Sequence, residues 1–228
     1  MNVLAIDTSN HSLGVAIIKN SHVAGELVTT IKKNHSVRLM PAIQQLMAST
    51  ETTPEELDRI AVAVGPGSFT GVRIGLSTAK TMAWSLDIPV VGISSLEAVA
   101  FQGQYFSGQV CPFFDARRGL VYTSLYDGSG NRIKDEANVL MNDWLLELKA
   151  TETRTLFLSQ DLQVHEEQIT SIMGDLAVIP EASYHQPRPA SMGLAAIRRE
   201  PTPVHRLVPN YLRMAEAEAK WLERQEKS

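Results

Sequence analysis

The fold is decided by residues 59–75, RIAVAVGPGSFTGVRIG. The apolar run at 59–64 predicts a short buried strand, and Gly65-Pro66-Gly67 predicts a sharp turn at its end. A long helix is predicted directly after this turn, over residues 70–85. A strand, a glycine-rich turn and a helix in succession are typical of α/β proteins.

The segments on either side place this stretch within a larger unit. Turn residues Lys19-Asn20-Ser21 predict that the strands before and after them are antiparallel neighbours. Ser36 and Ser95 are predicted to cap the helices that they begin. Strands are predicted at 3–7, 13–18, 22–30, 59–64 and 89–93, and helices at 36–49, 70–85 and 95–102. Three strands, a helix, a strand and a helix form the half-unit of the actin-like ATPase fold.

The second half of the chain repeats this order in a shorter form. Strands at 110–114, 121–126 and near Val139 match the opening, and helices at 143–149 and 164–173 flank a strand at 155–158. A proline-rich connector at 180–209 contains a short helix at 192–198, and a charged helix at 214–225 is expected to pack on the first lobe. We therefore predict an α/β, two-lobed actin-like fold (the ASKHA group of Hsp70, actin and sugar kinases) with a reduced second lobe. The first lobe is assigned to residues 1–104 and 205–228, and the second to 105–204.

Composition limits the classes of function. The net charge of −4 argues against broad non-specific binding of nucleic acid, which requires clustered Lys and Arg. Cys111 is the only cysteine, so neither an internal disulfide nor a cysteine-rich zinc site is possible. Because the chain has no signal peptide and no apolar run of about 20 residues, we expect a soluble cytoplasmic protein that does not enter the membrane.

Two polar turns are candidates for nucleotide binding. Asp7, Thr8 and Ser9 lie at the end of the first strand, where actin-like ATPases hold phosphate and metal. The equivalent turn of the second lobe contains Asp115, Arg117 and Arg118, and its arginines are suited to pairing with phosphate. The alternatives are a capped turn at Asp7 and a solvated hairpin turn at Asp115. Actin-like ATPases normally have a glycine after the Asp-x pair, where this chain has Ser9. The glycine-rich loop at 65–75 lacks the lysine and hydroxyl pair that ends a P-loop.

The helix at 70–85 has one face with almost no side chains. Gly71, Gly75 and Ala79 recur every four residues, so another backbone can approach this face closely. Two glycines within a helix each cost about 1 kcal/mol relative to alanine, which a close contact has to offset. The contact is either with the chain's own sheet or with another subunit. The full set of candidate interface residues is Met40, Ile43, Met47, Gly71, Gly75, Ala79 and Met82.

The histidines and serines provide no familiar catalytic pattern. No histidine has a partner at metal-ligand spacing, and no serine lies in a Gly-x-Ser-x-Gly context. We therefore predict neither a metal site nor a hydrolase triad.

Six blocks, in order and spacing, resemble the bacterial TsaB (YeaZ) family. They are Leu4-Ala5-Ile6-Asp7-Thr8-Ser9, His35-Ser36 with Leu39 and Pro41, residues 65–80, residues 92–98, residues 115–122, and Tyr211-Leu212-Arg213 with Glu216-Ala217-Glu218. Residues 133–200 contribute little to the resemblance. The resemblance implies a subunit that works with TsaD and the ATPase TsaE. That set transfers a threonylcarbamoyl group to N6 of adenosine 37 in tRNAs that read ANN codons.

The resemblance also implies that this chain is not the catalyst. TsaD binds a metal through a His-x-x-x-His pair, and the corresponding positions here are Ser95 and Val99, with Glu97 between them. One carboxylate cannot hold the metal alone. An actin-like nucleotide hydrolase that uses Asp7 and the Arg117 turn is the alternative function, and a metallopeptidase is a third that the missing histidines oppose.

The resemblance further implies how the chain associates. Family members use the helices at 36–49 and 70–85 to form homodimers and to contact TsaD. Gly75→Leu is then expected to block association and leave the monomer folded. We expect tRNA to be bound indirectly, through the complex. No cofactor of its own is expected, although ATP or ADP at the complex interface is compatible with the family.

Overall fold

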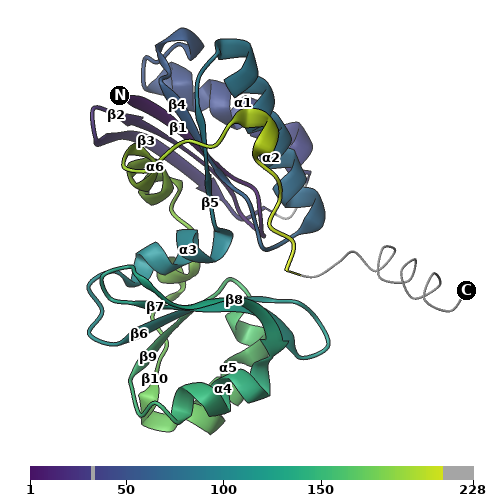
Figure 1. Ribbon diagram of the computed structural model, residues 1–228, viewed down its shortest axis with the longest axis vertical. Helices are drawn as coiled ribbons and strands as arrows, with labels where there is room; N and C mark the ends of the chain where they lie inside the picture. The colour runs from purple at the N-terminus through teal and green to yellow at the C-terminus, as the bar shows by residue number, and fades with distance from the viewer. Residues whose placement is uncertain (32–33, 213–228) are drawn as a thin grey trace, which may run out of the picture.

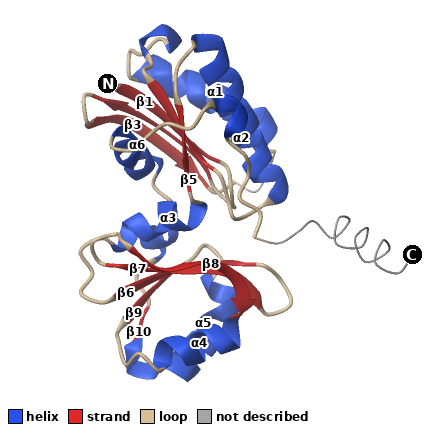
Figure 2. Cartoon of the chain, viewed as in Figure 1, coloured by secondary structure: helices blue, strands red, loops and turns tan. Residues whose placement is uncertain are grey.

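The computed structural model describes residues 1–31 and 34–212. The chain forms two lobes, each built on one five-stranded sheet, as Figures 1 and 2 show. The helix predicted at 214–225 lies outside the described residues. The two-lobed α/β fold that the strand and helix pattern predicted is confirmed.

The first lobe contains the sheet β3-β2-β1-β4-β5. β1 (Asn2–Asp7), β2 (Leu13–Lys19) and β3 (His22–Thr29) are antiparallel neighbours, whereas β4 (Arg59–Ala63) and β5 (Val90–Ile93) run parallel to β1. The parallel strands require crossover connections, which α1 (His35–Ser49) and α2 (Phe69–Leu86) provide. All three antiparallel strands and both crossover helices were predicted from the sequence.

The second lobe repeats the topology of the first, with the sheet order β10-β9-β6-β7-β8. Its strands are β6 (Gln109–Asp115), β7 (Leu120–Asp127), β8 (Arg132–Leu140), β9 (Thr155–Leu158) and the two-residue β10 (Ala177–Val178). The crossover helices are α4 (Met141–Lys149) and α5 (Leu162–Met173). The strand order is therefore the same in both sheets, and β1 and β6 are the central strands. The ends of these two strands lie at corresponding positions in the two lobes.

Helix α6 (Pro189–Ile197) corrects the lobe boundary that the sequence predicted. Ala190, Met192 and Ala196 pack against β1, β2, β4 and β5, on the face of the first sheet opposite α1 and α2 (Figure 1). A Cβ on Gly193 would lie 2.6 Å from Ile18 Cγ1, so the helix fits closely on the sheet. The chain therefore returns to the first lobe before residue 189, and not at 205.

Helix α3 (Ser95–Ala100) lies between the lobes. Ala98 packs with the core of the first lobe, whereas Leu96, Val99 and Ala100 pack with the core of the second. The cap of this helix is Ser94, whose side chain accepts the Leu96 and Glu97 backbone N–H groups, and not Ser95. Similarly, α1 begins after Asn34, in a left-handed conformation, instead of being capped by Ser36. No helix among residues 1–31 and 34–212 is long and apolar enough to cross a bilayer.

Candidate functional site

The last residue of β1, Asp7, is a buried carboxylate. Asp7 is only 2% exposed, and its Oδ1 accepts the Ser9 backbone N–H at 2.9 Å and the Ser9 hydroxyl at 2.7 Å. Asp7 Oδ2 has no hydrogen-bond partner among the described residues. Burial, the largest effect, raises the pKa of Asp7 above its usual value, although the two Ser9 hydrogen bonds and nearby His35 oppose the shift.

The raised pKa of Asp7 predicts a pH-dependent cost to stability. Between its unfolded and folded pKa values the folded state binds more protons, so stability is lost as pH rises through the folded pKa. Asp7→Asn keeps an oxygen for the Ser9 hydrogen bonds and removes the buried charge. We expect the variant to unfold at a higher urea concentration than the wild type at pH 8, with a smaller difference at pH 5. A variant that is less stable at both pH values would contradict this account.

The equivalent turn after β6 is a tight hairpin. Arg117, Arg118 and Gly119 all have left-handed backbones, at φ +65°, +57° and +75°. Asp115 Oδ2 accepts the Arg117 backbone N–H at 3.2 Å, and His165 Nε2 lies 3.0 Å from Asp115 Oδ1. The side chains of both arginines are exposed.

The two turns meet across a cleft of about 530 Å³ between the lobes. Of the predicted nucleotide-binding residues, Asp115 and Arg117 line this cleft, whereas Asp7, Thr8, Ser9 and Arg118 do not. Thr8 instead donates its hydroxyl to the Gly71 carbonyl at 2.7 Å, and Asp7 is held within the turn. The cleft is lined on the first lobe by Asn10, His11 and the start of α2.

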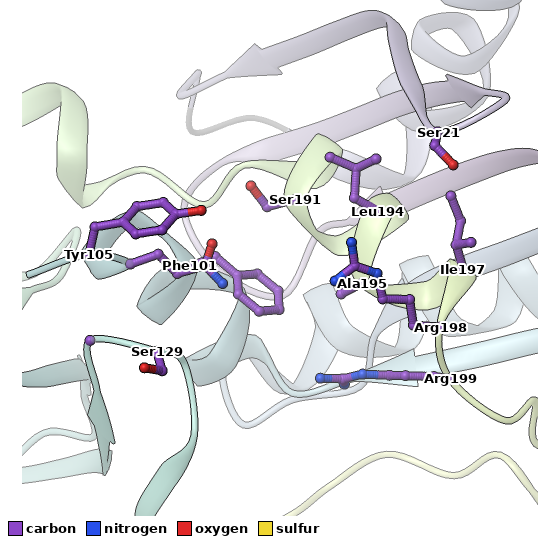
Figure 3. A pocket seen from close by; sticks show the side chains of 12 residues that line it. Ser21, Phe101, Tyr105, Ser129, Ser191, Leu194, Ala195, Ile197, Arg198 and Arg199 are labelled. Carbon is purple, nitrogen blue, oxygen red and sulfur yellow. The ribbon is translucent and has the colours of Figure 1, made fainter.

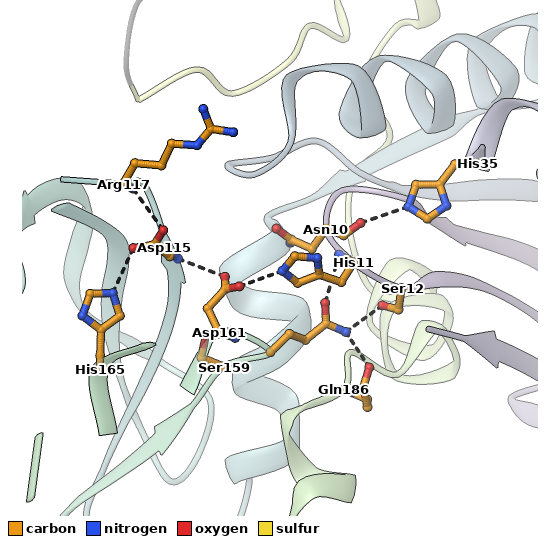
Figure 4. Close-up of polar contacts among 11 residues, drawn as sticks. Asn10, His11, Ser12, His35, Asp115, Arg117, Ser159, Asp161, His165 and Gln186 are labelled. Carbon is orange, nitrogen blue, oxygen red and sulfur yellow. Dashed lines mark hydrogen bonds and ion pairs between the residues drawn. The ribbon is translucent and has the colours of Figure 1, made fainter. Parts of the chain in front are cut away.

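Hydrogen bonds connect the lobes across this cleft (Figure 4). His11 Nε2 lies 2.7 Å from Asp161 Oδ1, and Asp161 Oδ2 accepts the Asp115 backbone N–H at 3.0 Å. Gln160 accepts the His11 backbone N–H at 3.1 Å and donates to Ser12 Oγ at 2.9 Å. These contacts link the loop after β1 to the loop after β9 and to the turn after β6.

The sequence did not predict His11, Gln160 or Asp161 as residues of the site. His11 and Asp161 are 150 positions apart, so no local spacing relates them. His165 pairs with Asp115 in the same way, across 50 positions. Only the matching order of the two sheets indicates that these loops meet.

Ser95 and Val99, the two positions that the family resemblance aligns with the TsaD metal pair, carry no imidazole. Ser95 and Val99 are fully buried, and Ser95 Oγ accepts the Gly65 backbone N–H at 3.1 Å. Glu97, which lies between them, forms a two-fold ion pair with Arg199, whose Nη1 donates to Oε2 at 2.9 Å. No group of three or more His, Cys, Asp or Glu side chains is arranged to hold a metal ion in the described part of the chain.

Comparisons with known proteins identify the family. A family model described as TsaD, tRNA N6-adenosine threonylcarbamoyltransferase, matches residues 22–221. The Bacillus subtilis protein named tRNA threonylcarbamoyladenosine biosynthesis protein TsaB is 48% identical over 228 residues, covering 99% of this chain and 100% of that relative. The chain belongs to the TsaB (YeaZ) family.

Solved structures agree with the assignment to the TsaB family. YeaZ from Pseudomonas aeruginosa matches with a TM-score of 0.77 and 26% identity, over 92% of this chain and 99% of that structure. A second Pseudomonas aeruginosa structure, of a protein described as similar to peptidase YEAZ, gives a TM-score of 0.78 and 26% identity, over 93% and 99% of the two chains. This TsaB-family chain thus shares its two-lobed arrangement with them.

The structure corrects the predicted interface of this TsaB-family chain. A Cβ on Gly71 would lie 2.2 Å from the Thr8 carbonyl oxygen, and one on Gly75 would lie 2.6 Å from Thr8 Oγ1. Ala79 is also buried, so the small-residue face packs on β1 and the turn after it. Ile43 and Met47 belong to the same core, and Met82 packs partly against it. Of the seven predicted residues, only Met40 is exposed.

Both crossover helices of this TsaB-family chain present an outer face that lacks carboxylates. On α1, Val37 and Met40 are 67% and 42% exposed. On α2, Trp84 is 78% exposed, and Ser77 and Thr81 are exposed in the two turns before it. Neither α1 nor α2 contains Asp or Glu. Their three Lys and Arg side chains contact the chain itself: Arg38 donates to Thr29, Arg73 to Tyr211 and Lys80 to Leu207. We call this the α1–α2 outer face, defined by Val37, Met40, Ser77, Thr81 and Trp84.

Proposed function

We propose that this chain is a non-catalytic subunit that binds and activates TsaD. The reaction would be transfer of a threonylcarbamoyl group to N6 of adenosine 37 in tRNAs reading ANN codons. The observation that carries the proposal is the Glu97–Arg199 ion pair between buried Ser95 and Val99. The Glu97 carboxylate is therefore paired with Arg199 and is not available as a metal ligand. Ser95 and Val99 on either side of it have no imidazole ring that could bind a metal. The name of the Bacillus subtilis relative supports the same pathway.

The α1–α2 outer face is the surface that we assign to the partner. Depletion of charge together with exposed apolar side chains distinguishes the centre of protein interfaces from other surface. Trp84 and Met40 are of the residue types enriched there. The same face would serve in a homodimer, so self-association and TsaD binding are expected to compete. TsaE and tRNA would then join through the complex and not through this surface.

Co-elution with purified TsaD tests the proposal. We expect the mixture to elute from a gel-filtration column as a heterodimer, with the homodimer of this chain reduced as TsaD is added. Separate elution of the two proteins at micromolar concentrations would contradict the proposed partnership.

Nucleotide binding in the inter-lobe cleft is the second candidate function. The cleft is lined by Ser68, Thr70 and Arg117, which can contact phosphate, and its volume of about 530 Å³ is within the range of small-molecule sites. The buried Asp7 does not line it, so the residue that would hold a phosphate-bound metal is absent from the cleft. The phosphates of any ATP or ADP bound here would thus be contacted by Ser68, Thr70 and Arg117 and not by Asp7. Calorimetric titration with ATP and magnesium separates the functions, because micromolar binding with turnover by the lone chain favours a hydrolase.

A further inference from the structure

A groove of about 900 Å³ lies on the other side of the molecule from the partner surface. It runs along α6 and is lined by residues of four separated segments: the turn between β2 and β3, the segment after α3, the turn between β7 and β8, and α6 with the residues that follow it. Figure 3 shows Tyr105 at one end of the groove and Arg198 and Arg199 at the other. The residues of the inter-lobe cleft are not among those lining the groove, so the two sites are separate.

Tyr105 presents an exposed aromatic ring at one end of the groove. Its side chain is 95% exposed, and its backbone has a left-handed φ of +73°. This conformation costs a residue with a Cβ about 1–2 kcal/mol. The Tyr105 backbone N–H donates to the Gly128 carbonyl at 2.8 Å, and a Cβ on Gly128 would lie 2.0 Å from the Phe106 carbonyl oxygen. These contacts fix the backbone of Tyr105, and its exposed ring contributes nothing to the core.

The other end of the groove provides one positive charge that the chain does not neutralise. Arg199 is paired with Glu97, whereas the exposed Arg198 guanidinium has no hydrogen-bond or ion-pair partner among the described residues. No Asp or Glu of the described part of the chain lines the groove. An anionic group in the groove would thus find a free arginine and no opposing carboxylate.

The floor between the two ends is apolar. Phe101, Leu194 and Ile197 are half-buried and line it, and Ser129 and Ser191 add hydroxyl groups. An exposed aromatic ring, an apolar floor and a single free arginine together match a planar ring that carries an anion. A nucleotide has this chemistry, because its base stacks on aromatic rings and its phosphate pairs with arginine.

We propose that this groove binds a nucleotide unit, with its base on Tyr105 and its phosphate on Arg198. The unit is either a free nucleotide or one residue of a single-stranded RNA segment. The proposal does not depend on the proposed function, since the groove belongs to this chain alone.

Fluorescence anisotropy of the full chain with a short labelled single-stranded RNA tests the groove, with unlabelled AMP as competitor. We expect Tyr105→Gly to weaken binding at least fivefold and Tyr105→Phe to retain it, since base stacking is worth about 1–3 kcal/mol. Glycine accepts the left-handed backbone, so Tyr105→Gly should be at least as stable as the wild type in thermal melts. Displacement by AMP identifies a free nucleotide as a ligand, and binding of RNA that AMP does not displace identifies an RNA strand.

Arg198 supplies an independent measurement. Because only one phosphate is paired, the logarithm of the association constant should fall with the logarithm of salt concentration at a slope of about −0.7. Arg198→Ala should weaken binding and abolish most of this slope, while Arg198→Lys should restore it. Tyr184→Ala, which removes an exposed tyrosine outside the groove, is the matched control. No detectable binding of either probe by the wild type, or binding that Tyr105→Gly and Arg198→Ala leave unchanged, would overturn the proposal.

Discussion

Replacing Gly71 with alanine is expected to lower the free energy of unfolding by about 2 kcal/mol, which corresponds to a fall in melting temperature of about 4–8 °C. In an open helix, alanine in place of glycine would raise stability by about 1 kcal/mol. Here the new Cβ would lie 2.2 Å from the Thr8 carbonyl oxygen, and a backbone atom in the turn after β1 cannot move aside cheaply. Thermal and urea unfolding of the variant measure the loss.

The sign of this effect separates the two explanations of the small-residue face. If the face with Gly71 and Gly75 were uncovered in the isolated chain and contacted only another subunit, alanine at position 71 would stabilise the isolated chain. Ser77→Ala, on the exposed face of the same helix, is the control and should change stability by less than about 0.5 kcal/mol. Unchanged or raised stability of Gly71→Ala would contradict packing of α2 on the Thr8 turn. By the same reasoning, Gly75→Leu is expected to destabilise the monomer and not merely to block association.

Placing an aspartate on the α1–α2 outer face is expected to weaken TsaD binding by about 2 kcal/mol or more, which is about thirtyfold. Met40→Asp would bury an unpaired carboxylate at the proposed contact, and Val37→Asp would do the same one turn earlier. Both side chains are exposed in the isolated chain, so the melting temperature should change little. Calorimetric titration of TsaD with each variant measures the effect.

Val164→Asp is the matched control for these variants. Val164 is 65% exposed and lies in the first turn of α5, on the second lobe. The substitution adds the same charge to a similarly exposed apolar position outside the proposed contact. Equal affinities for Met40→Asp and Val164→Asp would contradict the assignment of the partner surface.

The order of elements in the fold could be predicted because each element has a local signal. Apolar runs, turn residues such as Asn20-Ser21 and the helical period of α1 and α2 all act within a few positions. The second sheet followed from the repetition of the opening pattern. Return of α6 to the first lobe could not be predicted, because the proline-rich stretch shows where helices stop and not which sheet the next one covers.

The small-residue face shows why local signals did not suffice for function. A stripe of Gly71, Gly75 and Ala79 predicts close approach of a backbone, which the structure confirms, but not whose backbone it is. The same limit applies to the cleft. His11 Nε2 and Asp161 Oδ1 lie 2.7 Å apart only because two loops from different lobes meet. No residue near either one in the sequence predicts that they form a pair.

The central claim is that this chain is required for threonylcarbamoyl transfer but does not perform it. The most direct measurement is the amount of modified adenosine formed in tRNA when the chain is titrated into a mixture of TsaD, TsaE, ATP and the threonylcarbamoyl donor. We predict product that rises with the chain until it equals TsaD and then levels off, with none from the chain and donor alone. Product formed by the chain without TsaD, or undiminished product in the absence of the chain, would contradict the claim.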